Sequence, residues 1–254
     1  LAQGGVVALA ASIALSGCSA ATPADETKTI TIGTSNDAPF SYTDEAGNLV
    51  GIDGEMWNEI AKCGGWNTEV YVTDFATLIP SLQSKKIDVI VDAMYITDER
   101  KKTINFTDTW YTEGEGIVVP ADSTVASRDD LKGKVVGAQT GTAFADLVKE
   151  IGPKEEKYFD SQAALIAALE NGQIEAAITD QAVIGWSLAQ KPSDKIKIVS
   201  PYVSYFPGLV GAGVRKEDSE LLATINKCLA EVQAKPIFLE TLQKYGLGTD
   251  NLVK

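Results

Sequence analysis

Three side chains that suit a small charged ligand follow one short apolar run. Residues 87–91 are mostly apolar and β-branched, which is typical of a buried parallel strand. Asp92, Tyr95 and Arg100 lie past the carboxyl end of this run. Ligands bind beyond the carboxyl ends of the strands in open α/β sheets, and a guanidinium can hold a carboxylate by two parallel hydrogen bonds. Arg100 is therefore a candidate carboxylate clamp. The alternative is a surface arginine on a lysine-rich turn.

Two other predicted strand ends carry polar residues. Gln139 and Thr142 lie between a predicted strand at 134–138 and a predicted helix at 143–150. The N–H groups and positive partial charge of a helix N-terminus suit an anion, although Thr142 could simply be an N-cap. Asp180 ends a predicted strand at 176–179 and begins a helix, so it also could be only an N-cap. The nearby glycines match no nucleotide-binding motif.

The elements that would position these residues form two series. Strands and helices alternate from Thr29 to Val91, and the alternation restarts after Trp110-Tyr111. This order predicts two α/β lobes, each with a mostly parallel sheet flanked by helices. We expect strands at 29–33, 69–72, 87–91, 134–138, 176–179 and 195–199, and helices at 55–63, 78–86, 143–150, 163–170, 181–190 and 219–246. Pro80 predicts a distorted first turn in the second of these helices.

Short motifs along the chain together resemble a known family. The motifs are Ala38-Pro39-Phe40, Gly51-Ile52-Asp53, Asp74-Phe75, Ile96-Thr97-x-x-Arg100, Gly141-Thr142 and a strand-ending Asp180. Each motif is weak alone. Their order and spacing from Lys28 to Gly246 resemble the polar amino-acid-binding proteins of bacterial ABC importers, of the glutamine, lysine/arginine/ornithine and histidine type.

The resemblance implies a fold and its domain limits. It implies a two-lobed periplasmic-binding-protein fold (type II), in which the chain crosses to the second lobe and returns through two hinge strands. The crossings are expected near 110–117 and 204–209. Lobe one would be 28–112 plus 208–254, and lobe two 113–207.

The resemblance also implies roles for the polar residues. Arg100 would hold the α-carboxylate of an amino acid, assisted by Thr142 from the other lobe, and the neighbouring Gln139 is a further ligand-binding candidate. Asp180 would pair with the α-ammonium. Groups at Ala93 and Tyr95 would complete these contacts.

The side-chain pocket departs from the family pattern. Asp37 stands where many relatives have an aromatic residue, and Tyr95 stands where they have Ser or Thr. Phe40, Phe75 and Tyr95 could form an aromatic box with Asp37 at its mouth, a pattern similar to that of ectoine-binding members. Ring faces and carboxylates attract cations, which favours lysine, arginine, ornithine or a cyclic amidine over an acidic ligand. Asp92 could add negative charge or face solvent, and Phe40 could instead pack in the core.

The N-terminus has the character of a targeting segment. Residues 6–15 are apolar and too few to span a bilayer. They run into Leu15-Ser16-Gly17-Cys18, which resembles a bacterial lipobox. We expect a signal peptide at 1–17, lipidation at Cys18 and a flexible tether at 18–27. The alternative is an ordinary signal peptide with a chance cysteine. A basic start is missing, so we expect residues to precede Leu1 in the precursor.

Two further cysteines leave a choice open. Cys63 shares a predicted helical face with Met56 and Ile60, and Cys228 shares one with Ile225. We therefore expect both to face a core. An extracytoplasmic location favours a disulfide between them, and two separate buried thiols are the alternative.

Composition excludes several classes of function. The 254 residues carry a net charge of −13 and no histidine. An acidic surface argues against nucleic-acid binding. The absence of histidine excludes a Ser-His-Asp triad and histidine-ligated metals. We expect neither a cofactor nor a metal.

The sequence therefore predicts a monomeric, lipid-anchored, extracytoplasmic solute-binding protein that delivers a zwitterion to an ABC permease and is not an enzyme. One rival is an enzyme on the same fold, resembling periplasmic cyclohexadienyl dehydratases, with Asp37 or Asp92 as general acid. Another rival is a receptor sensor domain, which the lack of a transmembrane segment after Cys18 disfavours.

Overall fold

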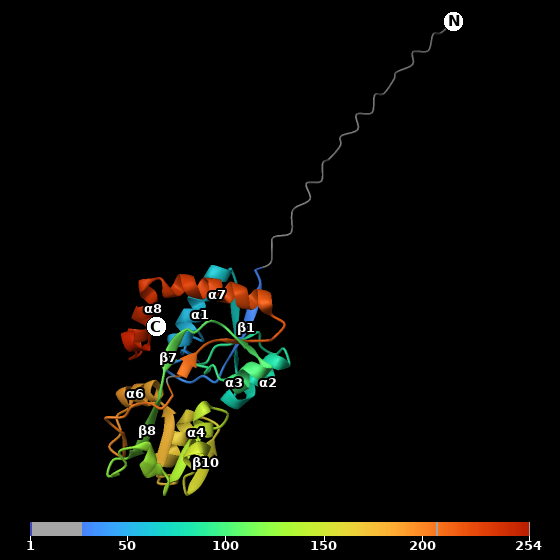
Figure 1. The fold of residues 1–254 in the computed structure, drawn as a ribbon. Coiled ribbons are helices and arrows are strands. Elements are labelled where there is room, and N and C mark those ends of the chain that lie inside the picture. The colour runs from blue at the N-terminus through green and yellow to red at the C-terminus, as the bar shows by residue number, and fades with distance from the viewer. Residues whose placement is uncertain (2–26, 207, 254) are drawn as a thin grey trace.

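The chain folds into two lobes, each built around a five-stranded sheet, as the upper and lower halves of Figure 1 show. The computed structural model describes Leu1 and residues 27–206 and 208–253. The predicted signal peptide and the tether up to residue 26, including Cys18, lie outside the described residues apart from Leu1. The strands are β1 (Thr29–Thr34), β2 (Tyr42–Thr43), β3 (Leu49–Val50), β4 (Asn67–Val72), β5 (Val89–Ile90), β6 (Asn105–Phe106), β7 (Tyr111–Glu113), β8 (Glu115–Pro120), β9 (Val135–Gln139), β10 (Glu155–Phe159), β11 (Ala176–Asp180), β12 (Ile196–Ile198), β13 (Gly208–Val210) and β14 (Gly213–Val214).

The two sheets have the same arrangement of strands. Their orders are β4-β1-β5-β14-β6 in lobe one and β10-β9-β11-β8-β12 in lobe two. In each sheet three neighbouring strands are parallel, the fourth is antiparallel to them, and the fifth pairs antiparallel with the fourth. Four of the five strands therefore point the same way, which confirms the prediction of mostly parallel sheets.

The reversed strand of each sheet marks where the chain crosses between lobes. β7 and β13 pair antiparallel outside both sheets, with Tyr111 opposite Val210. β7 continues into the reversed strand β8, and β13 continues into the reversed strand β14. The two crossing strands predicted near 110–117 and 204–209 are therefore present. They form a two-stranded connection that can bend as a hinge.

Helices cover the faces of both sheets. Lobe one carries α1, α2, α3, α7 and α8, and lobe two carries α4, α5 and α6 (Figure 1). The helices are α1 (Ile52–Gly64), α2 (Leu78–Gln83), α3 (Asp98–Thr103), α4 (Ala143–Ile151), α5 (Gln162–Glu170), α6 (Gln181–Gln190), α7 (Ser219–Gln233) and α8 (Pro236–Lys244), with 3-10 turns η1 (Phe75–Thr77), η2 (Arg128–Leu131) and η3 (Thr249–Asn251). Among the described residues, none of these helices is long and apolar enough to cross a membrane.

Some element limits differ from the sequence-based expectation. The strand expected at 87–91 is only β5, although the Val91 N–H still donates to the Gly33 carbonyl of β1 at 3.0 Å. Beyond it, Ala93 adopts a positive φ of 45°. The helix expected at 78–86 is α2, which runs from Leu78 to Gln83 and stops before Lys85, whose φ is 61°. Pro80 lies in the first turn of α2, where a proline is tolerated, and the 3-10 turn η1 precedes the helix. The C-terminal helical stretch is split in two, because Pro236 begins α8.

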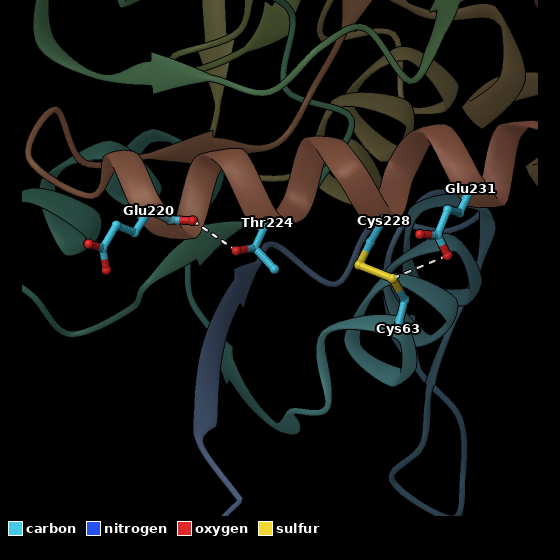
Figure 2. Close-up of a disulfide and its surroundings, with 5 residues drawn as sticks. All are labelled: Cys63, Glu220, Thr224, Cys228 and Glu231. Atoms are coloured by element: carbon cyan, nitrogen blue, oxygen red, sulfur yellow. Dashed lines mark hydrogen bonds between the residues drawn. A yellow bond between two sulfur atoms is a disulfide. The ribbon is translucent and has the colours of Figure 1, made fainter.

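A disulfide joins α1 to α7 on the outer side of lobe one (Figure 2). The Cα atoms of Cys63 and Cys228 are 5.7 Å apart, within the usual range for a disulfide. The bridge is thus confirmed over the alternative of two separate thiols. Only one of the two cysteines faces the core as expected, however. Cys228 is buried, whereas Cys63 is exposed, with Glu231 Oε2 3.7 Å from its sulfur.

Candidate functional site

A small cavity lies between the two lobes where the carboxyl ends of their strands face each other. All ten residues that the sequence singled out for ligand binding line it. Its volume is about 20 Å³, which is room for roughly one water molecule. An amino acid can enter only if the lobes separate or side chains move. The lining residues are Ser35, Asp37, Phe40, Phe75, Asp92, Ala93, Tyr95 and Arg100 from lobe one, and Gln139, Thr142, Ala143, Phe144, Gln162, Asp180 and Val183 from lobe two.

Arg100 spans the gap between the lobes. Thr97 caps α3 by accepting a hydrogen bond from the Arg100 N–H, which fixes the first turn of this short helix. The guanidinium donates from Nη1 to the Tyr95 carbonyl at 2.7 Å and from Nη2 to the Gly141 carbonyl of lobe two at 3.0 Å. It also lies over the Phe75 ring, 5.5 Å from the centroid. Burial lowers the pKa of Arg100 to about 10, so it stays charged at neutral pH.

Asp180 faces the same cavity from lobe two. It occupies the N-cap position of α6, but among the described residues its carboxylate caps no N–H group of that helix. It accepts instead from the Tyr95 hydroxyl at 3.1 Å. Burial raises the pKa of Asp180 well above its usual range, and the nearby Glu113 carboxylate adds to the effect. The explanation of Asp180 as only an N-cap is therefore wrong.

Glu113, which the sequence analysis missed, takes over the capping of α6. Its Oε1 accepts from the Ala182 N–H at 2.8 Å. Glu113 lies on the crossing strand β7, and burial raises its pKa to about 7. No local sequence pattern indicates this contact, because the two partners are 69 positions apart.

The second carboxylate region belongs to lobe one. Asp92 is buried, and it accepts from the Thr34 hydroxyl at 2.9 Å and from the Ser35 N–H at 2.9 Å and hydroxyl at 2.5 Å. Burial raises the pKa of Asp92 well above its usual range, and the negative charge of Asp37 adds to the effect. Asp37 is half-buried, and burial raises its pKa too. Asp92 therefore does not face solvent, and both carboxyl groups line the cavity.

The aromatic residues surround this acidic region. Phe40 is buried against the core, stacked on Tyr111 with ring centroids 6.4 Å apart, and it also lines the cavity. Core packing and cavity lining are thus both true of Phe40. The Tyr95 ring contacts Phe144 edge-on at 5.5 Å, and Phe75 is half-buried beside Arg100.

In lobe two, the turn after β9 holds its polar groups by local hydrogen bonds. The Thr142 hydroxyl accepts from the Ala145 N–H at 3.3 Å and donates to the Gln139 carbonyl at 2.7 Å, so it is the N-cap of α4 as well as a cavity residue. Gln139 Nε2 donates to the Asp160 carbonyl at 3.3 Å and reaches Asp37 of lobe one at 3.5 Å.

Several lining residues were not predicted. Phe144 and Val183 are apolar residues in the first turns of α4 and α6, and such positions usually belong to a core. Ser35 directly follows β1, and Gln162 directly follows Ser161. Their place directly after a strand or helix cap was the available signal. In the described residues, no group of three or more acidic or cysteine side chains is arranged to hold a metal.

The chain matches a known protein family. Residues 30–248 match the bacterial extracellular solute-binding proteins, family 3. The arginine-binding extracellular protein ArtP of Bacillus subtilis (strain 168) is 34% identical, over 90% of this chain and 91% of ArtP.

Two solved structures are also similar. An ancestral arginine-binding protein bound to arginine has a TM-score of 0.78 and 37% identity, over 86% of this chain and 98% of the other. The ancestral amino acid-binding protein AncCDT-1, a precursor of cyclohexadienyl dehydratase, has a TM-score of 0.77 and 30% identity, over 85% and 94%.

Proposed function

Because the chain belongs to family 3 of the bacterial extracellular solute-binding proteins, we propose that it captures a cationic amino acid between its lobes and delivers it to an ABC permease. One observation carries this proposal. A guanidinium from lobe one and a carboxylate from lobe two, Arg100 and Asp180, line the same small buried cavity. A free amino acid presents the two opposite charges that this pair can satisfy. Leaving either charge unpaired in such a cavity would be costly.

The remaining charge of the cavity selects the side chain. Asp37 and Asp92 line its lobe-one wall together with the rings of Phe40 and Phe75. A cationic side chain would gain from these carboxylates and ring faces, each ring contributing on the order of 0.5–2 kcal/mol. An acidic side chain would add a third negative charge there. L-arginine is our leading candidate, supported by the similarity to arginine-binding proteins, and lysine, ornithine and ectoine-like amidines follow.

Binding would proceed by opening and closing about the crossing strands. We propose lobe one as 28–112 plus 208–254 and lobe two as 113–207. The hydrogen bonds from Arg100 to Gly141 and from Tyr95 to Asp180 join the lobes, so separation of the lobes would break both. The ligand would then replace them with its own carboxylate and ammonium, and closure would bury it.

A thermal-shift screen followed by calorimetric titration tests the ligand. A solute that binds only the folded protein raises its melting temperature once its concentration exceeds Kd. The screen should compare L-arginine, lysine, ornithine, ectoine, glutamine and glutamate. We expect arginine or another cationic solute to bind tightest. Tightest binding of glutamate would overturn the charge argument.

We propose further that the mature protein is a monomer anchored outside the cytoplasm through lipidated Cys18. The lipobox-like sequence Leu15-Ser16-Gly17-Cys18 supports this attachment. The Cys18→Ala protein should leave the membrane fraction and appear in the medium or periplasm. If it remains with membranes, the lipobox interpretation is wrong or a partner holds it.

A dehydratase is the second candidate, favoured by the similarity to AncCDT-1 and by the carboxyl groups Asp37 and Asp92, whose raised pKa values would suit a general acid. Incubating the protein with arogenate or prephenate and measuring the aromatic product separates the two functions. We expect no product.

A further inference from the structure

Asp53 is a buried carboxylate that the proposed ligand contacts do not use. Its exposed fraction is 2%. One oxygen, Oδ2, accepts from the Ala93 N–H at 2.5 Å, and the other, Oδ1, accepts from the Tyr111 hydroxyl at 2.6 Å. Ala93 lines the cavity, whereas Tyr111 begins the crossing strand β7. A single side chain thus connects the binding cavity to the hinge.

The backbone around Asp53 also holds a second loop of lobe one that lines the cavity, the loop after β1 that contains Phe40. The Asp53 N–H donates to the Phe40 carbonyl at 2.7 Å, and the Ile52 N–H donates to the Pro39 carbonyl at 2.8 Å. Gly51 makes this approach possible. It has a φ of 98°, and a Cβ there would collide with the Pro39 and Phe40 carbonyls. The Phe40 ring in turn stacks on Tyr111.

Ala93 needs a partner of this kind. Its φ of 45° lies in the left-handed region, which is unfavourable for a non-glycine residue. Such a conformation persists only where the surroundings determine it. The hydrogen bond to Asp53 holds the Ala93 peptide in this orientation, and so directs the chain from Ala93 to Tyr95 along the cavity wall.

The same loop is also joined to the other crossing strand, β13. Tyr95 forms a β-bridge with Val210, and the Ile96 N–H donates to the Leu209 carbonyl at 2.8 Å. Gly208 is required there, because a Cβ at this position would overlap the Tyr95 ring. The cavity loop is thus connected to both crossing strands: to β7 through Asp53 and Tyr111, and to β13 directly. β7 and β13 in turn pair with each other.

We propose that Asp53 is a positioning residue that couples the cavity loop 93–95 to the hinge through Tyr111. The proposal rests on the proposed function in that it takes this cavity as the solute site. Bending of β7 against β13 would move Tyr111, and the shared carboxylate would pass that movement to the Ala93 peptide. Solute binding at the loop would stabilise one arrangement of the hinge by the same route.

Two single substitutions test the hydrogen bonds that Asp53 makes. Tyr111→Phe deletes the hydroxyl that binds Asp53 and keeps the ring that supports Phe40, and Asp53→Asn changes the carboxylate itself. Tyr202→Phe is the matched control. The Tyr202 hydroxyl donates to another buried carboxylate, Glu115 on β8, at 2.6 Å, and neither residue lines the solute cavity.

Two measurements should be made on each variant. In hydrogen exchange without solute, Tyr111→Phe and Asp53→Asn should both speed exchange in residues 93–96 and in β7, whereas Tyr202→Phe should leave residues 93–96 unchanged. With L-arginine as probe, release should be about tenfold faster in the first two variants, the size expected for one hydrogen bond to a charged group, and within about twofold of wild type in the control.

The outcomes separate this proposal from the proposed function. If the wild type binds no solute but exchange in 93–96 and β7 rises together, the coupling stands and the ligand assignment fails. If exchange in 93–96 is unchanged in both variants, or rises equally in Tyr202→Phe, the coupling is overturned whatever the protein binds.

Discussion

The two lobes share one sheet arrangement but reach the cavity in different ways. In lobe two, β9 and β11 lead almost directly into α4 and α6, so Thr142 and Asp180 stand at helix N-termini. In lobe one, β1 and β5 lead into loops, which include Asp37 and the left-handed Ala93. The backbone that carries the lobe-two residues is therefore set by regular strand–helix junctions, whereas that of lobe one depends on loops held by contacts from elsewhere.

This difference assigns different tasks to the lobes. Lobe one contributes most of the acidic and aromatic side chains and the guanidinium, which would recognise the solute. Lobe two contributes Asp180 and helix ends that, under the proposed function, would meet the solute on closure. Lobe one is also the lobe with a disulfide, and the segment 113–207 contains no cysteine.

The largest effect is expected from Arg100→Ala, which removes the positive charge that lobe one contributes to the cavity. Losing one partner of a buried charge pair should weaken binding of L-arginine by on the order of 2–5 kcal/mol with the fold intact. Calorimetric titration measures the loss, and circular dichroism checks the fold. The control is Lys101→Ala, which removes an exposed charge from the same helix. Binding of the Arg100 variant within about threefold of wild type would contradict the clamp.

Removing the disulfide should affect the stability of lobe one. The bridge joins residues 165 positions apart. Loss of such a cross-link typically costs about 2–5 kcal/mol. Denaturant unfolding of Cys63→Ala/Cys228→Ala measures this cost. Hydrogen exchange should show faster opening of β1 and β4 than of β9 and β10, and equal changes in both sheets would mean that the lobes unfold as one unit.

Asp180→Asn should discriminate between ligands instead of abolishing binding. The substitution removes the negative charge assigned to the α-ammonium, at about 1.5–3 kcal/mol. Affinity should fall much more for L-arginine than for its N-acetyl derivative, which lacks that charge. Equal losses for both solutes, measured by the same titrations, would show that Asp180 does not contact the ammonium.

The smallest predicted effect is a rise in stability as the pH is lowered from 8 to 5. Burial raises the pKa of Asp53 to about 6 and that of Glu113 to about 7, from about 4 in an unfolded chain. Between these values the folded protein binds more protons than the unfolded chain, so the free energy of unfolding falls as pH rises through this range. The exposed carboxyls with lowered pKa values, Asp44, Asp130 and Glu175, act at lower pH.

Thermal unfolding at several pH values checks this, with an expected difference of about a few degrees. Glu113→Gln should flatten the pH dependence, since the amide does not titrate. A melting temperature that rises steadily from pH 5 to pH 8 would contradict the prediction.

Much of the site was predictable because strand ends are visible in sequence. The apolar run before Asp92 and the strand–helix junctions at Thr142 and Asp180 placed polar residues at one edge of each sheet. The alternation of strands and helices indicated two lobes. The return of the chain to lobe one was implied only by resemblance, because composition and periodicity carry no information on which distant strands pair.

The sequence by itself determined which residue types stand at the strand ends, and the acidic, aromatic character of the cavity they could form. Only the tertiary structure decided how those groups are held. Within the described residues, the Asp180 carboxylate makes no capping bond to α6, where Glu113, 67 positions earlier in the numbering, caps the helix instead. Ala93 is held in place by Asp53, 40 positions earlier. Such contacts depend on packing in three dimensions, since a hydrogen bond between distant residues leaves no periodic pattern in the chain.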